Sequence, residues 1–420
     1  MTAVSSEVPV RRRRSAALLP RLLAGVQPGV GSVSLADHLD IHGPATPTSL
    51  DGVARSGLRG RGGAGFPVAA KMRAVLNARG RAVVVANGAA SDPLSEKDAF
   101  LLARVPHLVL DGAQLAAQLV KAKRIYLYVV GVDSILTTVR YALSERSRRG
   151  LDRVPVSIAT APDTYVAGEA SAVVQALSGG PAVPTFRPPR MAERGVGRRP
   201  TLVNNVETLA NLGLLARHDP DWFRQLGLVE EPGSLVITVH GHDGVPAVVE
   251  VPIGTTVGEV LETTDRWARV PTAVLVGGAS GRWLRADIAV ETPLSHDGLR
   301  DVGGALGVAS LMVLHDDECG LMETARLARF LAAETAGQCG PCINGLPAIA
   351  STLASLVAGD ADDRDVDRMK KWCGIMPGRG ACGHPDDTAG LVASALSVFE
   401  DDIAWHLRGS CRHASAGADR

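Results

Sequence analysis

Strand-like and helix-like segments alternate in the first half of this chain, and this alternation limits the possible folds more than any other feature. Apolar runs at residues 81–87, 124–130 and 154–159 predict buried strands. Segments with apolar residues at helical spacing lie between and after them, at 105–121, 134–148 and 168–177. The alternation predicts an α/β domain with a mainly parallel sheet, whose ligands bind at the carboxyl ends of the strands.

A glycine- and arginine-rich segment precedes the first of these strands. It reads Gly57-Leu58-Arg59-Gly60-Arg61-Gly62-Gly63-Ala64-Gly65-Phe66-Pro67, with Lys71 shortly after. Glycine weakens both helices and strands, so the segment predicts a loop whose backbone approaches an anion closely. It matches neither a Walker A loop nor a dinucleotide fingerprint. Flexible linkers contain Ser and Gly rather than interspersed Arg, so an ordered anion-binding loop is favoured.

Composition and charge exclude several classes of protein. The 44 basic and 44 acidic residues cancel, and aromatic residues make up 4%, which argues against a nucleic-acid partner. We find no apolar run of membrane-spanning length and predict no transmembrane segment. The run Arg11–Arg14 is interpreted as a basic tail rather than a secretory signal, so we expect a cytoplasmic protein.

The cysteines cluster near the C-terminus. Four of the six, Cys339, Cys342, Cys373 and Cys382, lie in one stretch. In a cytoplasmic protein such a cluster indicates metal or iron–sulfur ligands before disulfides. Spacing alone leaves a zinc site with four thiolates open.

The rest of the chain divides by pattern. Residues 179–200 are predicted to be irregular, and Pro200 to Thr208 leads into a helix that ends near Leu215. Residues 232–284 contain short β runs, and the pattern is helical from Leu321 onward.

Taken in order, these motifs resemble the flavin-carrying, NADH-oxidising subunit of respiratory complex I and the related flavin subunits of NAD-dependent hydrogenases and formate dehydrogenases. The motifs are the loop 57–67 with Lys71, Asn87, and the segments 165–169, 204–208 and 338–342. The resemblance implies a Rossmann-like α/β domain for FMN, a ubiquitin-like β-grasp domain of the soluble-ligand-binding type, and a C-terminal helical bundle with a [4Fe–4S] cluster. We expect a lead-in at 1–45, these three domains at 46–225, 230–290 and 300–411, and a tail at 412–420.

The resemblance also implies the site residues. Those expected at FMN are Gly60, Arg61, Gly62, Gly63, Lys71, Asn87, Tyr165, Gly168, Glu169, Asn204, Asn205 and Thr208. Those expected at the nicotinamide nucleotide are Phe66, Asp92 and Arg190.

The chain departs from the family pattern around the nucleotide. Ala89 and Ala90 replace two acidic residues, and Ala167 and Ala170 replace a cysteine and a glutamate in the 165–170 turn. An arginine, Arg190, stands where the family has the phenylalanine that stacks on adenine. Loss of acids and gain of arginine suit a 2′-phosphate. Weak NADH binding, a change to NADPH and the absence of nicotinamide binding all stay open.

The cluster motif departs at one ligand, because Ala336 stands where the family has its first cysteine. Cys339, Cys342 and Cys382 match the other three. A [4Fe–4S] cluster normally takes four thiolates, so a [3Fe–4S] cluster, a non-family fourth ligand or no cluster remain open. Cys373 is the tentative fourth ligand, followed by Cys319, His384 and Glu334, whereas Cys319 and Cys411 otherwise resemble buried cysteines without a function.

The expected function is electron transfer from a reduced nicotinamide through FMN to an iron–sulfur cluster and a partner protein. The resemblance implies a small [2Fe–2S] subunit or ferredoxin-like partner, and a location that can be peripheral to the inner membrane through a redox complex. The alternative is a subunit that does not oxidise nicotinamide and acts as an electron-transfer partner or a binding or assembly module.

Overall fold

A computed structural model describes residues 18–413 of the chain, apart from Pro47, Ala90, Arg187, 242–243 and 267–270. The basic tail at Arg11–Arg14, the substituted Ala90 and most of the predicted C-terminal tail lie outside the described residues.

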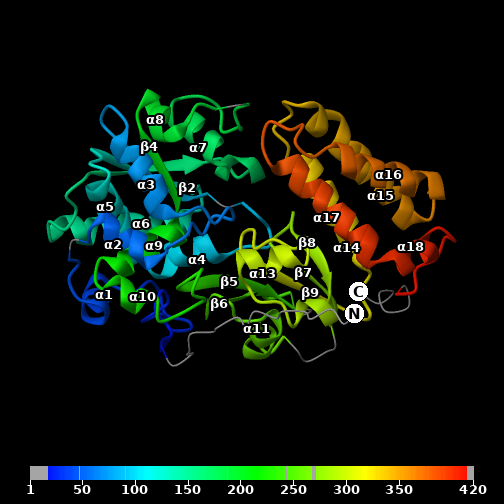
Figure 1. The fold of residues 1–420 in the computed structure, drawn as a ribbon, viewed down its shortest axis with the longest axis horizontal. Helices are drawn as coiled ribbons and strands as arrows, with labels where there is room; N and C mark the ends of the chain where they lie inside the picture. Colours follow the sequence, from blue (N-terminus) through cyan, green and yellow to red (C-terminus); the bar gives the residue numbers. More distant parts are fainter. Residues whose placement is uncertain are drawn as a thin grey trace, which may run out of the picture.

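The first part of the chain forms a four-stranded sheet in the order β3-β2-β1-β4, and every pairing is parallel (Figure 1). The three predicted strands are present with small shifts at their ends, and a fourth strand, β4, was not predicted. The strands are β1 (Val83–Gly88), β2 (Arg124–Val130), β3 (Val156–Ala161) and β4 (Thr201–Asn205). Asn87 of β1 lies beside Asn205 of β4 in register, so the carboxyl ends of these two strands meet at one edge.

Helices cover both faces of this sheet. Val84 and Ala86 of β1 join one apolar core, and the alternate residues Val83 and Val85 join another on the opposite face, as expected of a parallel sheet buried on both sides. The helices are α1 (Leu35–His42), α2 (Leu50–Ser56), α3 (Val68–Asn77), α4 (Lys97–Arg104), α5 (Pro106–Leu119), α6 (Asp133–Arg148), α7 (Ala170–Leu177), α8 (Met191–Arg194), α9 (Val206–Leu215) and α10 (Pro220–Phe223). The segment 179–200, predicted as irregular, contains α8 and a 3₁₀ turn, Val196–Arg198.

Helices α5 and α9 approach so closely that glycine is required where they cross. A Cβ on Gly112 would lie 1.7 Å from the carbonyl oxygen of Leu209, and one on Gly213 would lie 2.4 Å from that of Leu108. Backbone-to-backbone packing of this kind fixes α9, whose first turn borders the site described below.

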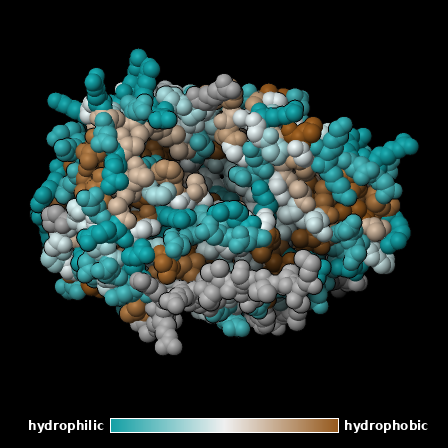
Figure 2. All heavy atoms as spheres, viewed as in Figure 1, coloured by the Kyte–Doolittle hydropathy of each residue, from teal (hydrophilic) through white to brown (hydrophobic). Residues whose placement is uncertain are grey.

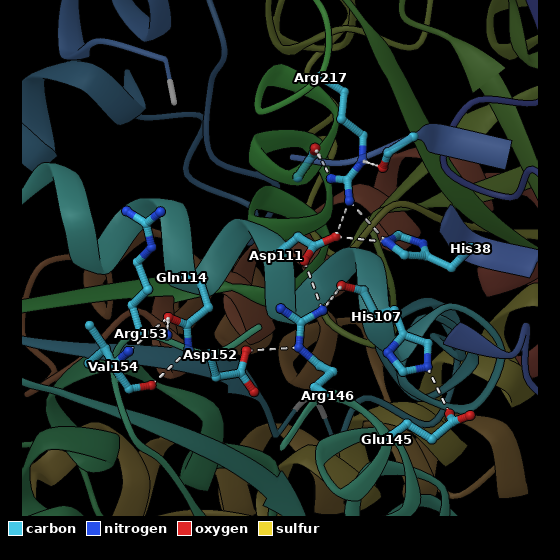
Figure 3. A network of polar contacts seen from close by, with 12 residues as sticks. His38, His107, Asp111, Gln114, Glu145, Arg146, Asp152, Arg153, Val154 and Arg217 are labelled. Atoms are coloured by element: carbon cyan, nitrogen blue, oxygen red, sulfur yellow. Dashed lines mark hydrogen bonds and ion pairs between the residues drawn. The ribbon is translucent and has the colours of Figure 1, made fainter. Parts of the chain in front are cut away.

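A buried network of charges ties α5 to its neighbours (Figure 3). The Asp111 carboxylate on α5 lies 2.8 Å from Arg146, 2.5 Å from Arg217 and 2.7 Å from His38. Burial opposes the ionised form of Asp111, but the hydrogen bond from His38 and the two arginines hold its pKa well below the ordinary range. Arg146 also pairs with Asp152 at 2.8 Å, so the network joins α1, α5, α6 and the chain after α9.

A second sheet has five strands in the order β6-β5-β9-β7-β8, with parallel and antiparallel pairs. Its strands are β5 (Ser234–His240), β6 (Ala247–Pro252), β7 (Pro271–Val276), β8 (Arg282–Arg285) and β9 (Ser310–His315), and its helices are α11 (Val257–Thr263), α12 (Ala286–Ala289) and α13 (His296–Asp301). Strand β9 occupies the centre of this sheet, so the sheet extends past the boundary predicted at residue 290. The β runs at 232–284 gave no sign of a strand supplied from later in the sequence.

The last part of the chain is helical, as predicted from Leu321 onward (Figure 1). Its elements are α14 (Gly320–Ala333), a π-helical turn (Pro341–Gly345), α15 (Leu346–Ala358), α16 (Asp363–Ile375), α17 (His384–Val398) and α18 (Glu400–His406). The surface is hollowed between these helices and the α/β part (Figure 2).

One helical run in the described residues, Pro341–Ala358, is long and apolar enough to cross a membrane by length and composition, with mean hydropathy 1.4 over 18 residues. The prediction that no apolar run reaches this length is therefore wrong, because the π-helical turn continues into α15 without a charged residue. Leu346, Ile349, Leu353 and Leu356 are buried in the core of the helical part. A core helix meets the same criterion, so the run is weak evidence of a membrane span.

Candidate functional site

The glycine-rich loop is ordered and closes on itself between α2 and α3. The N–H of Gly60 donates to the carbonyl of Phe66 at 2.9 Å, and that of Val68 donates to Leu58 at 3.0 Å. Gly63 and Gly65 have φ values of 100° and 59°, which favour glycine. The N–H of Arg61 donates to Thr208 Oγ1 at 2.8 Å, which fixes the loop against the first turn of α9. The predicted loop is thus a rigid wall rather than a linker.

The loop borders a cavity of about 480 Å³ at the carboxyl ends of β1 and β4. Its volume lies in the range of small-molecule sites. All twelve residues predicted for FMN except Gly63 line this cavity, together with the predicted nucleotide residues Phe66 and Asp92. The cavity residues used below are Gly60, Arg61, Gly62, Phe66, Lys71, Asn87, Asp92, Lys97, Asp98, Tyr165, Gly168, Glu169, Asn204, Asn205, Thr208, Cys382 and His384.

Two polar side chains in this cavity lack the partners that they need. The Lys71 ammonium donates to the carbonyl of Val203, and burial lowers the pKa of Lys71 with no carboxylate among the described residues acting against it. The Asn204 Nδ2 atom is buried and has no hydrogen-bond partner among the described residues. A partly buried cation without a carboxylate and a buried donor without a partner are costly, and an anionic, polar ligand would satisfy both. These residues therefore fit the phosphate and polar ring edge of FMN.

The other side of the cavity has charges that are already paired. Lys97 lies 2.7 Å from Asp98 and 3.0 Å from Glu207. Although burial opposes the charged form, the two carboxylates raise the pKa of Lys97. Asn205 caps α9 through Glu207 N–H at 2.9 Å and donates to Asp98 at 2.5 Å. The sequence analysis did not identify Lys97 and Asp98 as cavity residues. The feature that could have indicated them is a Lys-Asp pair soon after the strand that ends at Asn87.

The predicted turn at 165–169 is a 3₁₀ turn, Tyr165–Gly168, that leads into α7. Asn87 Nδ2 donates to the carbonyl of Gly168 at 2.9 Å, so the end of β1 holds the turn. The Glu169 carboxylate accepts from the N–H groups of Ser171 and Ala172 and so caps α7. Glu169 thus has a structural role beside its predicted place at the flavin.

The three predicted nucleotide residues lie in different surroundings. Phe66 is at the cavity rim with 57% of its surface exposed. Asp92 is buried and accepts at 3.0 Å from the N–H of Ala279, in the turn between β7 and β8, and burial raises its pKa to about 6. Tyr165 lies between Asp92 at 3.5 Å and Ser280 at 2.8 Å. Arg190 is exposed, does not line the cavity, and lies 3.9 Å from Glu193.

Three of the four predicted metal-site cysteines lie near one another. Burial, and then the neighbouring Cys339 and Cys382, raise the pKa of Cys342 to about 12. Burial, Glu169 and Cys339 raise that of Cys382, which also lines the cavity. The N–H of Ala336 donates to Cys342, so the residue at the missing ligand position lies beside the group. Cys339, Cys342 and Cys382 fit an iron–sulfur group held by three thiolates.

The other cysteines considered for the fourth ligand lie elsewhere. Cys373 is buried in the helical core, and burial alone raises its pKa to about 11, without a contribution from another cysteine. Cys319 contacts His406 at 3.3 Å and interacts with Cys411. Of the weaker candidates, Glu334 accepts from Tyr165 N–H at 2.9 Å, and His384 has a buried Nδ1 without a partner among the described residues.

A parallel sheet with an anion-binding glycine loop at its strand ends, and with thiols beside the same cavity, defines an α/β flavin- or nucleotide-binding protein with an adjoining metal centre. Two family models match the chain: the Nuo51 FMN-binding domain at residues 53–213, and the NADH-ubiquinone oxidoreductase-F iron-sulfur binding region at 322–406. The chain therefore contains both regions of this family of flavin subunits, in chain order.

Individual relatives agree with this family. The chain is 28% identical over 370 residues to the F-type subunit of the NADH-quinone oxidoreductase of Streptomyces coelicolor, covering 85% of this chain and 82% of the relative. It is 29% identical over 402 residues to an F-type subunit, the one numbered 2, of the same oxidoreductase in Rhizobium meliloti, covering 92% and 94%. A solved NAD⁺-reducing [NiFe]-hydrogenase in the H₂-reduced state is similar with a TM-score of 0.80 and 31% identity over 85% of this chain. The chain spans 62% of that hydrogenase chain's length.

Proposed function

We propose that this chain is an electron-transfer subunit that takes electrons from a reduced nicotinamide and passes them through FMN and an iron–sulfur cluster to a partner protein. The observation that carries the proposal is the shared cavity. Its wall contains Lys71, which has no carboxylate partner among the described residues, the unpartnered Nδ2 atom of Asn204, and Cys382 of the three-thiol group. A flavin held in this cavity would therefore lie beside Cys382.

The residues of the cavity divide the work of holding FMN. Lys71 and the backbone of Gly60 and Gly62 would hold the phosphate, and Asn87 and Asn204 would face the polar ring edge. The flavin would supply acceptance of a hydride and release of single electrons. Tyr165 and the glycine loop, which is closed by backbone hydrogen bonds, form part of the wall of the pocket. Lys97 stays charged through Asp98 and Glu207, which keeps the first turn of α9 in place.

The cluster is proposed to be held by Cys339, Cys342 and Cys382, with Cys373 outside the group. Ala336 leaves one corner without a thiolate. A [3Fe–4S] cluster or a [4Fe–4S] cluster with a ligand other than cysteine satisfies this donor set.

A second candidate function is a binding or assembly subunit that does not oxidise nicotinamide. The carboxylates that remain near the cavity favour this candidate, because both already accept hydrogen bonds within the chain. Asp92 accepts from the N–H of Ala279, and Glu169 caps α7. With these carboxylates occupied, a ribose hydroxyl has few acceptors. The exposed Arg190 would favour NADPH over NADH if it turned toward the cavity, since a guanidinium pairs with a 2′-phosphate.

The finer organisation is proposed from the same family. The five-stranded sheet around α11 would be the β-grasp domain, the α/β part would be the FMN domain, and the helices from α14 to Cys411 would be the iron–sulfur domain. A small [2Fe–2S] subunit or a ferredoxin-like protein would be the partner, in the cytoplasm or at the inner membrane as part of a redox complex.

Anaerobic purification followed by reconstitution with FMN, iron and sulfide tests the proposal. We expect flavin and iron–sulfur absorbance, bleaching on titration with NADH or NADPH, and an EPR signal on reduction. The variant Ala336→Cys should change that EPR signal to that of a four-thiolate cluster. If neither NADH nor NADPH reduces the flavin and the cluster, but a low-potential electron-transfer protein does, the second candidate is favoured. A colourless protein after reconstitution would contradict both cofactor assignments.

A further inference from the structure

A second group of metal-ligand side chains lies in the helical part, and none of its residues lines the cavity described above. Cys319 precedes α14, His406 ends α18, and Cys411 follows in the C-terminal segment. One ligand atom from each of the three lies within 4.8 Å of the other two.

We propose that Cys319, His406 and Cys411 bind a divalent zinc-type ion, with a fourth position open to water. Two sulfurs and an imidazole nitrogen form a donor set that zinc uses in proteins. Zinc bonds of about 2.3 Å to sulfur and about 2.0 Å to nitrogen place tetrahedral S and N ligands roughly 3.6 Å apart. The Cys319 Sγ and His406 Nε2 atoms are 3.3 Å apart, so a small adjustment would admit the ion.

The imidazole is oriented as a ligand. Its Nδ1 lies 3.2 Å from the carbonyl oxygen of Val357, which can only accept, so Nδ1 carries the proton. The Nε2 atom that faces Cys319 therefore has a free lone pair. A backbone carbonyl on the far nitrogen is the arrangement that holds metal-binding histidines in place.

The surroundings favour a cation between the two thiols. Cys319 and His406 are 8% and 2% exposed. A divalent metal would offset the charges of the two thiolates in this buried place.

The C-terminal segment is held so that Cys411 faces this group. Arg412 lies 2.7 Å from the buried carboxylate of Asp402, and His413 Nδ1 lies 2.9 Å from the carbonyl oxygen of Asp316. The other nitrogen of His413 lies 3.1 Å from Arg412, so His413 has no free atom for the ion. The described residues thus offer three ligands, and the metal would join the start of α14, the end of α18 and the chain end.

The experiment is zinc and iron analysis of the full chain, expressed with added zinc and purified without chelator. We expect about one zinc per chain in addition to the iron. X-ray absorption at the zinc edge should show two sulfur ligands with nitrogen and oxygen completing the shell. Replacement by Co²⁺ should give thiolate-to-metal charge-transfer absorbance in the near ultraviolet.

Matched variants separate this site from zinc misplaced in the iron–sulfur site. Cys411→Ser, chosen because Cys411 is only partly buried, and His406→Gln should weaken zinc binding by at least about 100-fold, whereas Cys382→Ser and Cys373→Ala should keep it. Circular dichroism checks that each variant is folded. Zinc lost from Cys382→Ser but kept by Cys411→Ser would overturn the proposal. So would a chain that binds neither zinc nor Co²⁺, or a Cys319–Cys411 disulfide in anaerobically purified protein.

Discussion

Two buried groups of charge in the α/β part of this protein differ in whether their partners are present. Around Asp111, the carboxylate meets Arg146, Arg217 and His38 at 2.5 to 2.8 Å. In the cavity, Lys71 has only a carbonyl partner, and the Nδ2 atom of Asn204 has none among the described residues. The first group is complete and serves stability, whereas the second is complete only with a ligand. Partner satisfaction, and not burial, distinguishes a structural cluster from a binding site.

The largest loss of stability is expected when the carboxylate at the centre of the complete group is removed. Asp111→Ala leaves Arg146 and Arg217 buried without their carboxylate, and we expect it to lower the free energy of unfolding by about 3–5 kcal/mol. Urea unfolding followed by circular dichroism measures this. The control Asp287→Ala removes the partner of Arg285 from an exposed pair and should leave the midpoint almost unchanged. Equal losses in the two variants would contradict the assignment.

Acidification should lower stability next, through two histidines beside the complete group, His107 on α5 and His42 on α1. Burial, and then neighbouring positive groups, lower the pKa of His107 and of His42 to about 4, from an ordinary value of 6.5. Between pH 6.5 and 4 the folded chain binds fewer protons than the unfolded chain, so the free energy of unfolding falls as the pH falls. Urea midpoints measured across this window test it. In His107→Gln the loss of stability across the window should be smaller, and an unchanged profile would count against the role of His107.

The incomplete group should respond in ligand binding rather than stability. Lys71→Ala should weaken FMN binding roughly 10- to 100-fold, because a charge-assisted contact to phosphate is lost. The urea midpoint should stay the same or rise, since a partly buried cation whose pKa burial lowers is removed. Flavin fluorescence titration measures the affinity. The control Arg73→Ala on the same helix concerns a half-exposed side chain paired with Asp51 and should bind FMN as the parent does.

The smallest effect on FMN binding is expected from removing the amide side chain of Asn204. Asn204→Ala should weaken FMN binding roughly 3- to 10-fold, the usual worth of a neutral hydrogen bond. The free energy of unfolding should change little, because the Nδ2 atom has no partner to lose. If instead Asn204→Ala unfolds the chain as readily as Asp111→Ala, the distinction between the two groups fails.

Much of the fold could be predicted from local pattern. The three strands at 81–87, 124–130 and 154–159 and the intervening helices correspond to β1, β2, β3, α5 and α6, because apolar period and run length are local properties. Strand β9 was missed as a member of the second sheet, because its partners β5 and β7 lie far back in the sequence. The membrane-length run at Pro341–Ala358 was missed although no charged residue interrupts it.

The sequence by itself determined an anion-binding type of loop at 57–67 and a cluster of thiols near the C-terminus, because residue type and spacing are local properties. The candidates Lys71, Asn87, Asn204, Cys339, Cys342 and Cys382 came from the order of the motifs and their resemblance to the flavin-subunit family. Only the tertiary structure decided which of them have partners. It set Lys71 and Asn204 in one cavity with Cys382, bound Glu169 to the start of α7, and brought Cys319, His406 and Cys411 together from three segments. Whether a buried polar group is satisfied depends on neighbours distant in the chain, and no local pattern contains that information.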